Sequence, residues 1–339
     1  MPQPSLWVKT LPVLDMAVAH ALPEGVITNG EIKKRDILIQ ELHTLFNQNK
    51  IKKISKNVGI VANLPEAKTF LKFLTLSGKT GEEVNKYILK SVTSEIPIPQ
   101  EELSLNTQIF KDRSGINSAL IGAAPKTSVE AFTSVLEELN LNIFALEIES
   151  VAITRAILPP IEDGELKKTE MIIDIGSERT SAIFTTGGIP RLTVLVPFSG
   201  NMLTKAIAEK LNLTLEKAEE VKLRCGLDIK KCEGALKESM TFIIDDFLSK
   251  VRDAIKFYHS QFIDAPKVGL IHLSGGGAYL QKLDSILSKE LKIKARPADL
   301  YKNIVLPPKS GGSSLLHYVA AIGLSLRGSL APFPEYESR

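Results

Sequence analysis

Residues 171–180 read Met-Ile-Ile-Asp-Ile-Gly-Ser-Glu-Arg-Thr, and a second apolar run occupies residues 182–184. Two apolar runs around a short polar segment predict a strand, a tight turn and a second strand. Gly176 would let the backbone approach a ligand closely, and successive turn amides form an anion-binding concavity. Asp174 before the turn suits a Mg²⁺ ion held through water. An ordinary Asx turn in a hairpin explains the same residues, so both interpretations stay open.

The composition is that of a globular protein of about two domains. The 339 residues are 44% hydrophobic and 24% charged, and a net charge of +3 is too small to indicate a nucleic-acid partner. No stretch approaches the roughly 18 apolar residues of a membrane-spanning helix, and the N-terminus does not read as a signal peptide. Cys225 and Cys232 have neither CxxC nor zinc spacing. We therefore expect two free thiols in a reducing cytoplasm.

The N-terminal part has the alternating pattern of an α/β unit. Residues 13–22 read as a strand that could be buried on both faces, and 26–32 as a short extended segment with an Asn-Gly turn signal. An amphipathic helix is predicted over 35–47 and a buried strand over 57–63.

The pattern changes near residue 66. Strand, helix, strand, strand and helix are then predicted over 69–76, 80–91, 103–110, 118–122 and 127–140. A strand and a helix that resume the α/β pattern of the N-terminal part are predicted over 142–158. Because the segment 66–143 lies between elements of one α/β domain, we interpret it as an insertion. The polar residues 161–170 are the best domain boundary.

Several elements follow the opening hairpin. A third strand is predicted over 192–196 and a buried strand over 267–273; helices are predicted over 200–211, 215–225, 237–262, 279–291 and 317–327. The small residues of 149–152 and 320–324 would allow two helices to cross closely, as in a hinge between two halves.

Gly275, Gly276 and Gly277 lie between a predicted strand and a predicted helix. Backbone amides there could hold a flat or anionic ligand, because open α/β sheets bind ligands at the carboxyl ends of their strands. A tight strand-to-helix turn is the commoner cause of such a glycine run.

Two further groups each allow two interpretations. Glu219 and Lys222 share a helix face and could be a solvated ion pair, or could clamp a nucleoside. Gly200, Asn201 and Thr204 could be a simple helix cap, or could border the same pocket. The five histidines are scattered, His272 reads as a core residue, and no Ser-His-Asp, Cys-His or Walker pattern is present.

Four motifs occur in an order that resembles the actin/Hsp70/hexokinase-type ATPase fold. They are the Asp-Ile-Gly hairpin, the Gly-Asn-x-x-Thr helix start, the Ala-Glu-Glu-x-Lys helix and the Ser-Gly-Gly-Gly turn. Residues 21–27, 96–99, 146–150, 197–204 and 321–327 narrow the resemblance to the PilM family, the FtsA-like proteins of type IV pilus assembly. The match runs from about residue 13 to residue 328.

The resemblance implies an α/β, actin-like ATPase fold, in which two α/β domains enclose a nucleotide cleft and an FtsA-like subdomain is inserted. The expected divisions are a first domain of 1–65, 144–160 and 317–328, an inserted subdomain of 66–143, a second domain of 161–316 and a tail of 329–339.

The resemblance also implies ATP or ADP with Mg²⁺ as cofactors, and a role for each site residue. Asp174, Gly176, Ser177 and Thr180 would form the second phosphate loop, with Asp174 on the Mg²⁺ side. Gly200, Asn201, Thr204, Glu219 and Lys222 would line the nucleoside pocket, and Gly275, Gly276 and Gly277 would form the adenosine loop. The helices around 149–155 and 319–325 would be the interdomain hinge.

One departure from the family concerns its first phosphate hairpin. Residues 1–12 contain neither Asp nor Gly, so that hairpin is missing at the N-terminus, and Trp7-Val8-Lys9 would be a remnant of its second strand. Its loss would remove half of the phosphate contacts and the main acid on the Mg²⁺ side. Either translation starts upstream of Met1, or the chain is a degenerate member.

By the resemblance, the protein is expected to be a cytoplasmic scaffold, peripheral at the inner membrane, with slow or absent ATP hydrolysis. Its partners would be other pilus platform proteins and the cytoplasmic N-terminal tail of a PilN-type single-span protein, held in a groove between the inserted subdomain and the first domain. The alternative is a sugar or acid kinase of the same superfold. That reaction needs an Asp general base between the halves, and Asp15 is the one candidate.

Overall fold

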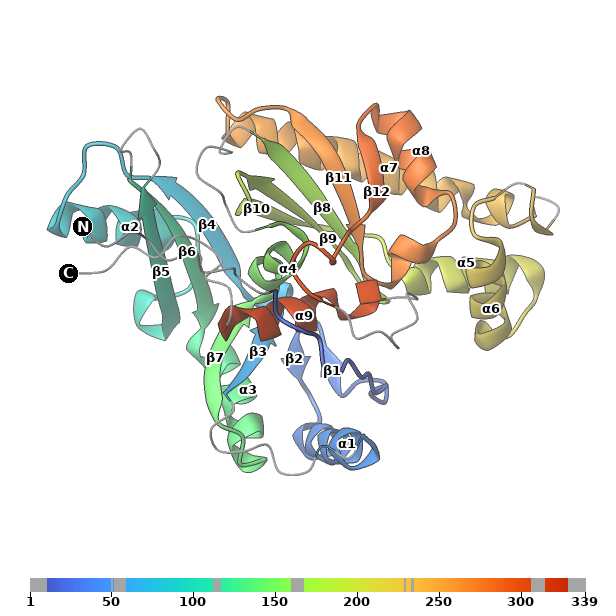
Figure 1. Ribbon diagram of the computed structural model, residues 1–339, viewed down its shortest axis with the longest axis horizontal. Coiled ribbons are helices and arrows are strands. Elements are labelled where there is room, and N and C mark those ends of the chain that lie inside the picture. The colour runs from blue at the N-terminus through green and yellow to red at the C-terminus, as the bar shows by residue number, and fades with distance from the viewer. Residues whose placement is uncertain are drawn as a thin grey trace.

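A five-stranded sheet organises the larger lobe of the computed structural model, which describes residues 11–49, 51, 59–111, 117–159, 168–228, 230–232, 235–305 and 315–328 (Figure 1). Its strands are β8 (Thr169–Ile175), β9 (Thr180–Thr186), β10 (Ile189–Val196), β11 (Val268–Ser274) and β12 (Lys294–Pro297). They lie in the order β10-β9-β8-β11-β12. β8, β9 and β10 are antiparallel, whereas β11 and β12 run parallel to β8. Strand β12 was not predicted from the sequence.

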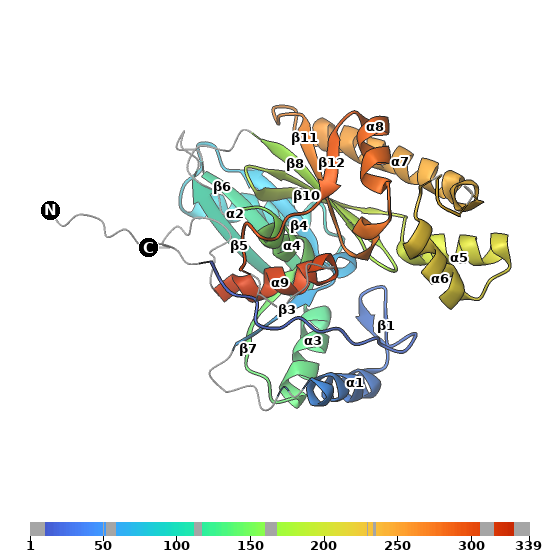
Figure 2. The same ribbon diagram turned by 45° about the vertical axis from the view of Figure 1, so that its right-hand side comes forward.

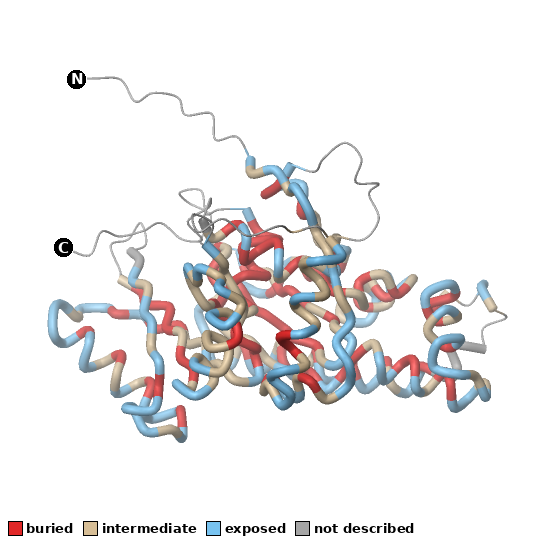
Figure 3. Tube along the Cα trace, turned by 90° about the horizontal axis from the view of Figure 1, so that it is seen from below, coloured by how far each residue is buried: buried red, intermediate tan, exposed pale blue. Residues whose placement is uncertain are grey.

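The helices of this lobe are α5 (Gly200–Leu211), α6 (Leu215–Cys225), α7 (Ala235–Gln261) and α8 (Leu283–Leu291). The apolar run Met171–Ile173 is fully buried in β8. Phe184 of β9 stacks on Tyr258 of α7, with 4.7 Å between the ring centroids. Burial is concentrated at the centre of the molecule, as Figure 3 shows. The opening sequence therefore forms the predicted strand, turn and strand at the middle of the sheet.

A smaller lobe is built on two parallel strands, β3 (Ile60–Leu64) and β7 (Ile143–Ile148). It also holds α1 (Arg35–Gln48), α3 (Lys126–Glu138) and the short hairpin of β1 (Ile27–Thr28) and β2 (Glu31–Ile32). Asn29 and Gly30 both have positive φ angles, 49° and 76°, which the twist of a two-residue hairpin requires. The predicted Asn-Gly turn is confirmed.

The strand predicted over residues 13–22 is wrong. Only Val13 makes a β-bridge, to Val305, and the rest of the segment is irregular. Val13 and Met16 are 66% and 56% exposed. A strand needs a hydrogen-bonded neighbour. Within the described ranges the segment joins none of the sheets, and β3 and β7 pair only with each other.

A third unit is the antiparallel sheet of β4 (Phe70–Thr75), β6 (Asn117–Pro125) and β5 (Leu103–Lys111), in the order β4-β6-β5. Helix α2 (Glu82–Thr93) packs on it through Val84, Ile88 and Val92. Helix α3 follows β6 in the chain, but its Val135 packs with Val26, Leu38 and Ile39 in the smaller lobe. The residues predicted as an insertion thus pack around two different cores.

Helices α4 (Glu149–Ile157) and α9 (Val319–Ser325) cross between the lobes (Figure 2). A Cβ atom on Gly323 would lie 1.8 Å from the carbonyl oxygen of Ala152, so only glycine allows this approach. Arg155 of α4 also donates to Glu147, at 2.5 and 2.6 Å, and to the carbonyl oxygen of Gly323 at 2.7 Å. The small-residue segments do cross as predicted.

Three expectations lie partly or wholly outside the described residues: most of the linker 161–170, the tail 329–339 and the Trp7-Val8-Lys9 remnant. Among the residues that the structure describes, no helix is both long and apolar enough to cross a membrane.

The expectation of two free thiols is wrong, because Cys225 and Cys232 form a disulfide with their Cα atoms 6.0 Å apart. Helix α6 ends at Cys225, and Gly226, with a φ of 57°, turns the chain back on itself. These two cysteines therefore do not indicate a reducing compartment.

Candidate functional site

The carboxyl ends of β8 and β11 lie side by side, and they bring two of the predicted loops together. Asp174 of β8 lies opposite Ser274 of β11 in the parallel register. The Ser274 hydroxyl donates a hydrogen bond of 2.6 Å to Asp174 Oδ1. Burial raises the pKa of Asp174 to about 6, and the nearby charge of Glu149 adds to the effect. This is the strand-end position at which open α/β sheets bind ligands.

The turn after Asp174 is docked on the start of α5. Gly176 N–H donates to the Arg179 carbonyl, which closes the turn. Gly200 and Asn201 N–H donate to the carbonyls of Gly176 and Ser177, both at 2.9 Å. Two predicted groups of site residues therefore touch through their backbones.

Two details of these groups differ from the sequence interpretation. The N-cap of α5 is Ser199, whose hydroxyl accepts from Met202 N–H, so Asn201 is not the capping residue. The Thr180 side chain is fully buried, and its hydroxyl has no hydrogen-bond partner among the described residues. It lies beneath the loop surface.

Glu219 and Lys222 of α6 pair with each other and with α5. Lys222 Nζ donates to Glu219 Oε2 at 2.7 Å, to Thr204 Oγ1 at 2.8 Å and to the Gly200 carbonyl at 3.1 Å. Burial acts to raise the pKa of Glu219, but hydrogen bonds from Lys222 and Thr204 hold it below its usual value. Lys222 is buried, so the interpretation as a solvated pair is wrong. The Glu219 side chain is 42% exposed and can still accept from a ribose hydroxyl.

The glycine run is required by packing. A Cβ atom on Gly275 would lie 2.4 Å from the Ile175 carbonyl oxygen, and one on Gly277 would lie 2.1 Å from Ile175 Cγ2. The predicted helix does not follow directly. A single 3-10 turn, Gly276–Tyr279, comes first, and α8 begins at Leu283 because Lys282 has a left-handed φ of 70°. The glycines bring backbone close to β8, but they lack an α-helix N-terminus beside them.

Glu149 was missed as a site residue. It opens α4 at the carboxyl end of β7, and its Oε2 lies 3.4 Å from Arg179 of the turn. Its charge also acts on Asp174. An acid directly after a predicted strand was the available signal, but the sequence could not show which loop it faces.

These residues suit a nucleotide with Mg²⁺. Asp174 at the end of β8 and Glu149 directly after β7 offer two carboxylates, and Mg²⁺ held largely through water takes only one or two. The glycines bring their backbone close to the end of β8, and the α5–α6 network places acid and amine groups at one border. Residues of the larger lobe, together with Glu149 of α4, therefore form an adequate donor set.

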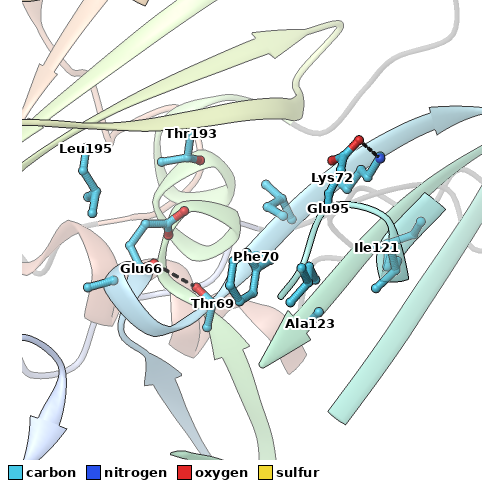
Figure 4. Close-up of a pocket in the computed structure, with 13 residues that line it drawn as sticks. Glu66, Thr69, Phe70, Lys72, Glu95, Ile121, Ala123, Thr193 and Leu195 are labelled. Atoms are coloured by element: carbon cyan, nitrogen blue, oxygen red, sulfur yellow. Dashed lines mark hydrogen bonds and ion pairs between the residues drawn. The ribbon is translucent and has the colours of Figure 1, made fainter. Parts of the chain in front are cut away.

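A second candidate site is a cavity of about 380 Å³ between the β4-β6-β5 unit and β10 of the larger lobe (Figure 4). Thr193 and Leu195 form the β10 wall; the other lining residues are Glu66, Ala67, Thr69, Phe70, Leu71, Lys72, Val92, Glu95, Ile96, Ile121 and Ala123. Leu195 and Phe70 are 45% and 37% exposed, which is high for large apolar side chains. The wall is about half apolar and half polar, and Glu66, Lys72 and Glu95 are its charged residues.

Glu66 is the buried acid of this cavity. Its two carboxylate oxygens accept from the backbone N–H and the hydroxyl of Ser150, both at 3.1 Å. In Figure 4 the carboxylate points from below toward the strand that carries Thr193. Burial raises the pKa of Glu66 to about 7, although the bonds from Ser150 oppose the shift. The other acid, Glu95, is exposed and pairs with Lys72.

The chain matches a known protein family in sequence. A sequence profile of the family described as type IV pilus assembly protein PilM matches residues 8–329. The cell division protein FtsA of Enterococcus hirae is 27% identical over 235 residues, which are 62% of this chain and 52% of that protein. The chain thus spans about half the length of the curated relatives it matches.

Solved structures agree on the fold. A PilM-PilN type IV pilus biogenesis complex is similar with a TM-score of 0.72 and 23% identity, over 91% of this chain and 89% of that one. MreB 5 of Spiroplasma citri bound to AMPPNP is similar with a TM-score of 0.54 and 17% identity, over 89% and 78%. The predicted actin-like ATPase fold is confirmed.

The raised pKa of Glu66 predicts a pH dependence of stability. Between about pH 4.5 and 7 the folded state holds a proton that the unfolded state releases, so stability falls as the pH rises. Glu66→Gln removes this loss and should gain on the order of 2–3 kcal/mol relative to the parent protein across that window. Urea unfolding at both ends of the window measures the gain. Glu95→Gln is the control for charge removal, and parallel curves for Glu66→Gln and the parent would contradict the prediction.

Proposed function

The chain belongs to the PilM family of type IV pilus assembly proteins, and from this premise we propose that it is an adenine-nucleotide-binding scaffold that holds the cytoplasmic tail of a PilN-type partner. The scaffold acts in the cytoplasm, at the inner membrane, beside other proteins of the pilus platform. The observation that carries the proposal is the presence of two separate sites, a strand-end loop cluster and a cavity with both apolar and charged walls.

The cavity is the proposed tail site. An extended peptide can place apolar side chains against Phe70 and Leu195, while its N–H groups meet the Glu66 carboxyl at the polar end. The cavity is lined chiefly by residues of the predicted insertion, but its other wall is β10 of the larger lobe and not the first domain with which the groove was predicted to form. A PilM-PilN complex among the similar structures supports this choice of partner.

The strand-end cluster is the proposed nucleotide site. ATP or ADP supplies phosphate charge, and Mg²⁺ when bound neutralises part of it. Asp174 and Glu149 would hold the ion through water, and the turn amides would meet the phosphates. Glu219, Lys222 and the glycine run would border the nucleoside. The similarity to an MreB structure with bound AMPPNP supports the assignment.

The kinase alternative finds no support in the first lobe. Asp15, its candidate base, lies exposed in the irregular segment after residue 11. A general base needs a fixed position against its substrate, which an exposed irregular segment does not provide. We therefore favour the scaffold.

Asp174→Asn tests the nucleotide site. Removing this carboxylate should weaken binding of AMPPNP with Mg²⁺ by about tenfold, or 1.4 kcal/mol, as measured by isothermal titration calorimetry. The matched control is Asp253→Asn on the outer face of α7, where the aspartate is 62% exposed. Equal affinities for both variants, or no binding by the parent protein, would remove the nucleotide from the proposal.

Leu195→Ser tests the tail site. The N-terminal cytoplasmic peptide of the PilN-type protein from the same genome should bind the parent protein and bind this variant about tenfold more weakly, because an apolar contact is lost. Ile263→Ser is the control, since Ile263 is 85% exposed and does not line the cavity. Fluorescence anisotropy of the labelled peptide gives both affinities. A peptide that binds all three proteins equally occupies another surface.

A further inference from the structure

The two sites are joined through the first turn of α4. Ser150, the second residue of that helix, is held by Glu66 from the cavity side, and both groups are buried. Glu149, the first residue, is held by Arg179 from the side of the phosphate turn, at 3.4 Å. Two neighbouring residues at the start of α4 therefore contact the two sites: Ser150 contacts Glu66 of the cavity, and Glu149 contacts Arg179 of the phosphate turn.

Glu66 has capacity to respond to an occupant of the cavity. A carboxylate has about four acceptor positions, and the two bonds from Ser150 leave room for further donors. The N–H groups of a peptide in the cavity would compete with Ser150 for this carboxylate. Its hydrogen bonds with Ser150 would lengthen or break, and the start of α4 would lose one of the contacts that hold it in place.

Arg179 has the corresponding position at the other site. The phosphates of a nucleotide at the turn would attract its guanidinium away from Glu149. Release of that pair also loosens the first turn of α4, which makes it easier for Glu66 to turn toward a peptide. In addition, β10 supplies both a wall of the cavity and a neighbour of β9, the strand that begins at the turn.

We propose that Glu66, Ser150, Glu149 and Arg179 form a relay through which nucleotide and partner tail strengthen each other's binding. Glu66 and Arg179 are its two switching contacts, and the first turn of α4 is the shared element. This inference rests on the proposed function, because it assigns regulation to the same two sites. Thermodynamic linkage requires the effect to be equal in both directions.

Calorimetric titration of the full chain with the tail peptide, with and without saturating AMPPNP and Mg²⁺, measures the coupling. For the parent protein the nucleotide should tighten peptide binding by about fivefold or more, within the usual range of coupling energies. Glu66→Ala should bring the ratio of the two affinities to about one. Glu66→Gln should restore it, because the amide can accept from Ser150 N–H and donate to its hydroxyl.

Two further variants separate the relay from general damage. Glu95→Ala removes the exposed acid of the same cavity and should keep the parent ratio. Arg179→Met breaks the contact at the far end, outside the cavity, and should give a ratio near one.

The outcomes distinguish this inference from the function on which it rests. If either ligand fails to bind the parent protein, the proposed function fails and the relay with it. If both bind, but nucleotide leaves peptide affinity within twofold or weakens it, the relay alone is wrong. A Glu66→Ala or Arg179→Met protein that keeps the parent ratio would likewise overturn it.

Discussion

The close crossing of α4 and α9 is the constraint on which the arrangement of the two lobes depends. Gly323 lies so near the Ala152 carbonyl that no side chain fits between the helices. The buried Arg155–Glu147 pair, joined by Arg327, holds the crossing from one side. Asn303 of the larger lobe donates to the carbonyls of Arg155, Ala156 and Leu158, and so caps the end of α4. The C-terminal end of α4 is therefore held in place, and a change in contacts at its first turn moves that turn relative to the fixed end.

That geometry explains why the candidate sites belong together. The phosphate turn is set by the β8–β11 register and by its docking on α5. The cavity is set by β4, β6 and β10. They share no lining residue, yet both reach α4 within one turn. Three carboxyl groups gather there, and the charge of Glu149 acts on both Glu66 and Asp174.

Much of the larger lobe could be predicted because its signals are local. The apolar run before Asp174, the amphipathic α7 and the strand before the glycines follow from periodicity alone. The features that could not be predicted depend on contacts between residues far apart in the chain. Residues 13–22 have strand-like composition but pair with none of the described strands. The roles of Glu149 and Glu66 depend on contacts made across 30 and 84 residues of chain, which no spacing rule reveals.

The central claim is that the two sites communicate through the start of α4. Hydrogen–deuterium exchange of the full chain with the tail peptide alone tests it most directly. We predict that the peptide changes exchange of the amides in 176–180, at the other site, as well as in 149–152 and 66–72. Changes confined to the segments that line the cavity, 66–72, 92–96, 121–123 and 193–195, would contradict it.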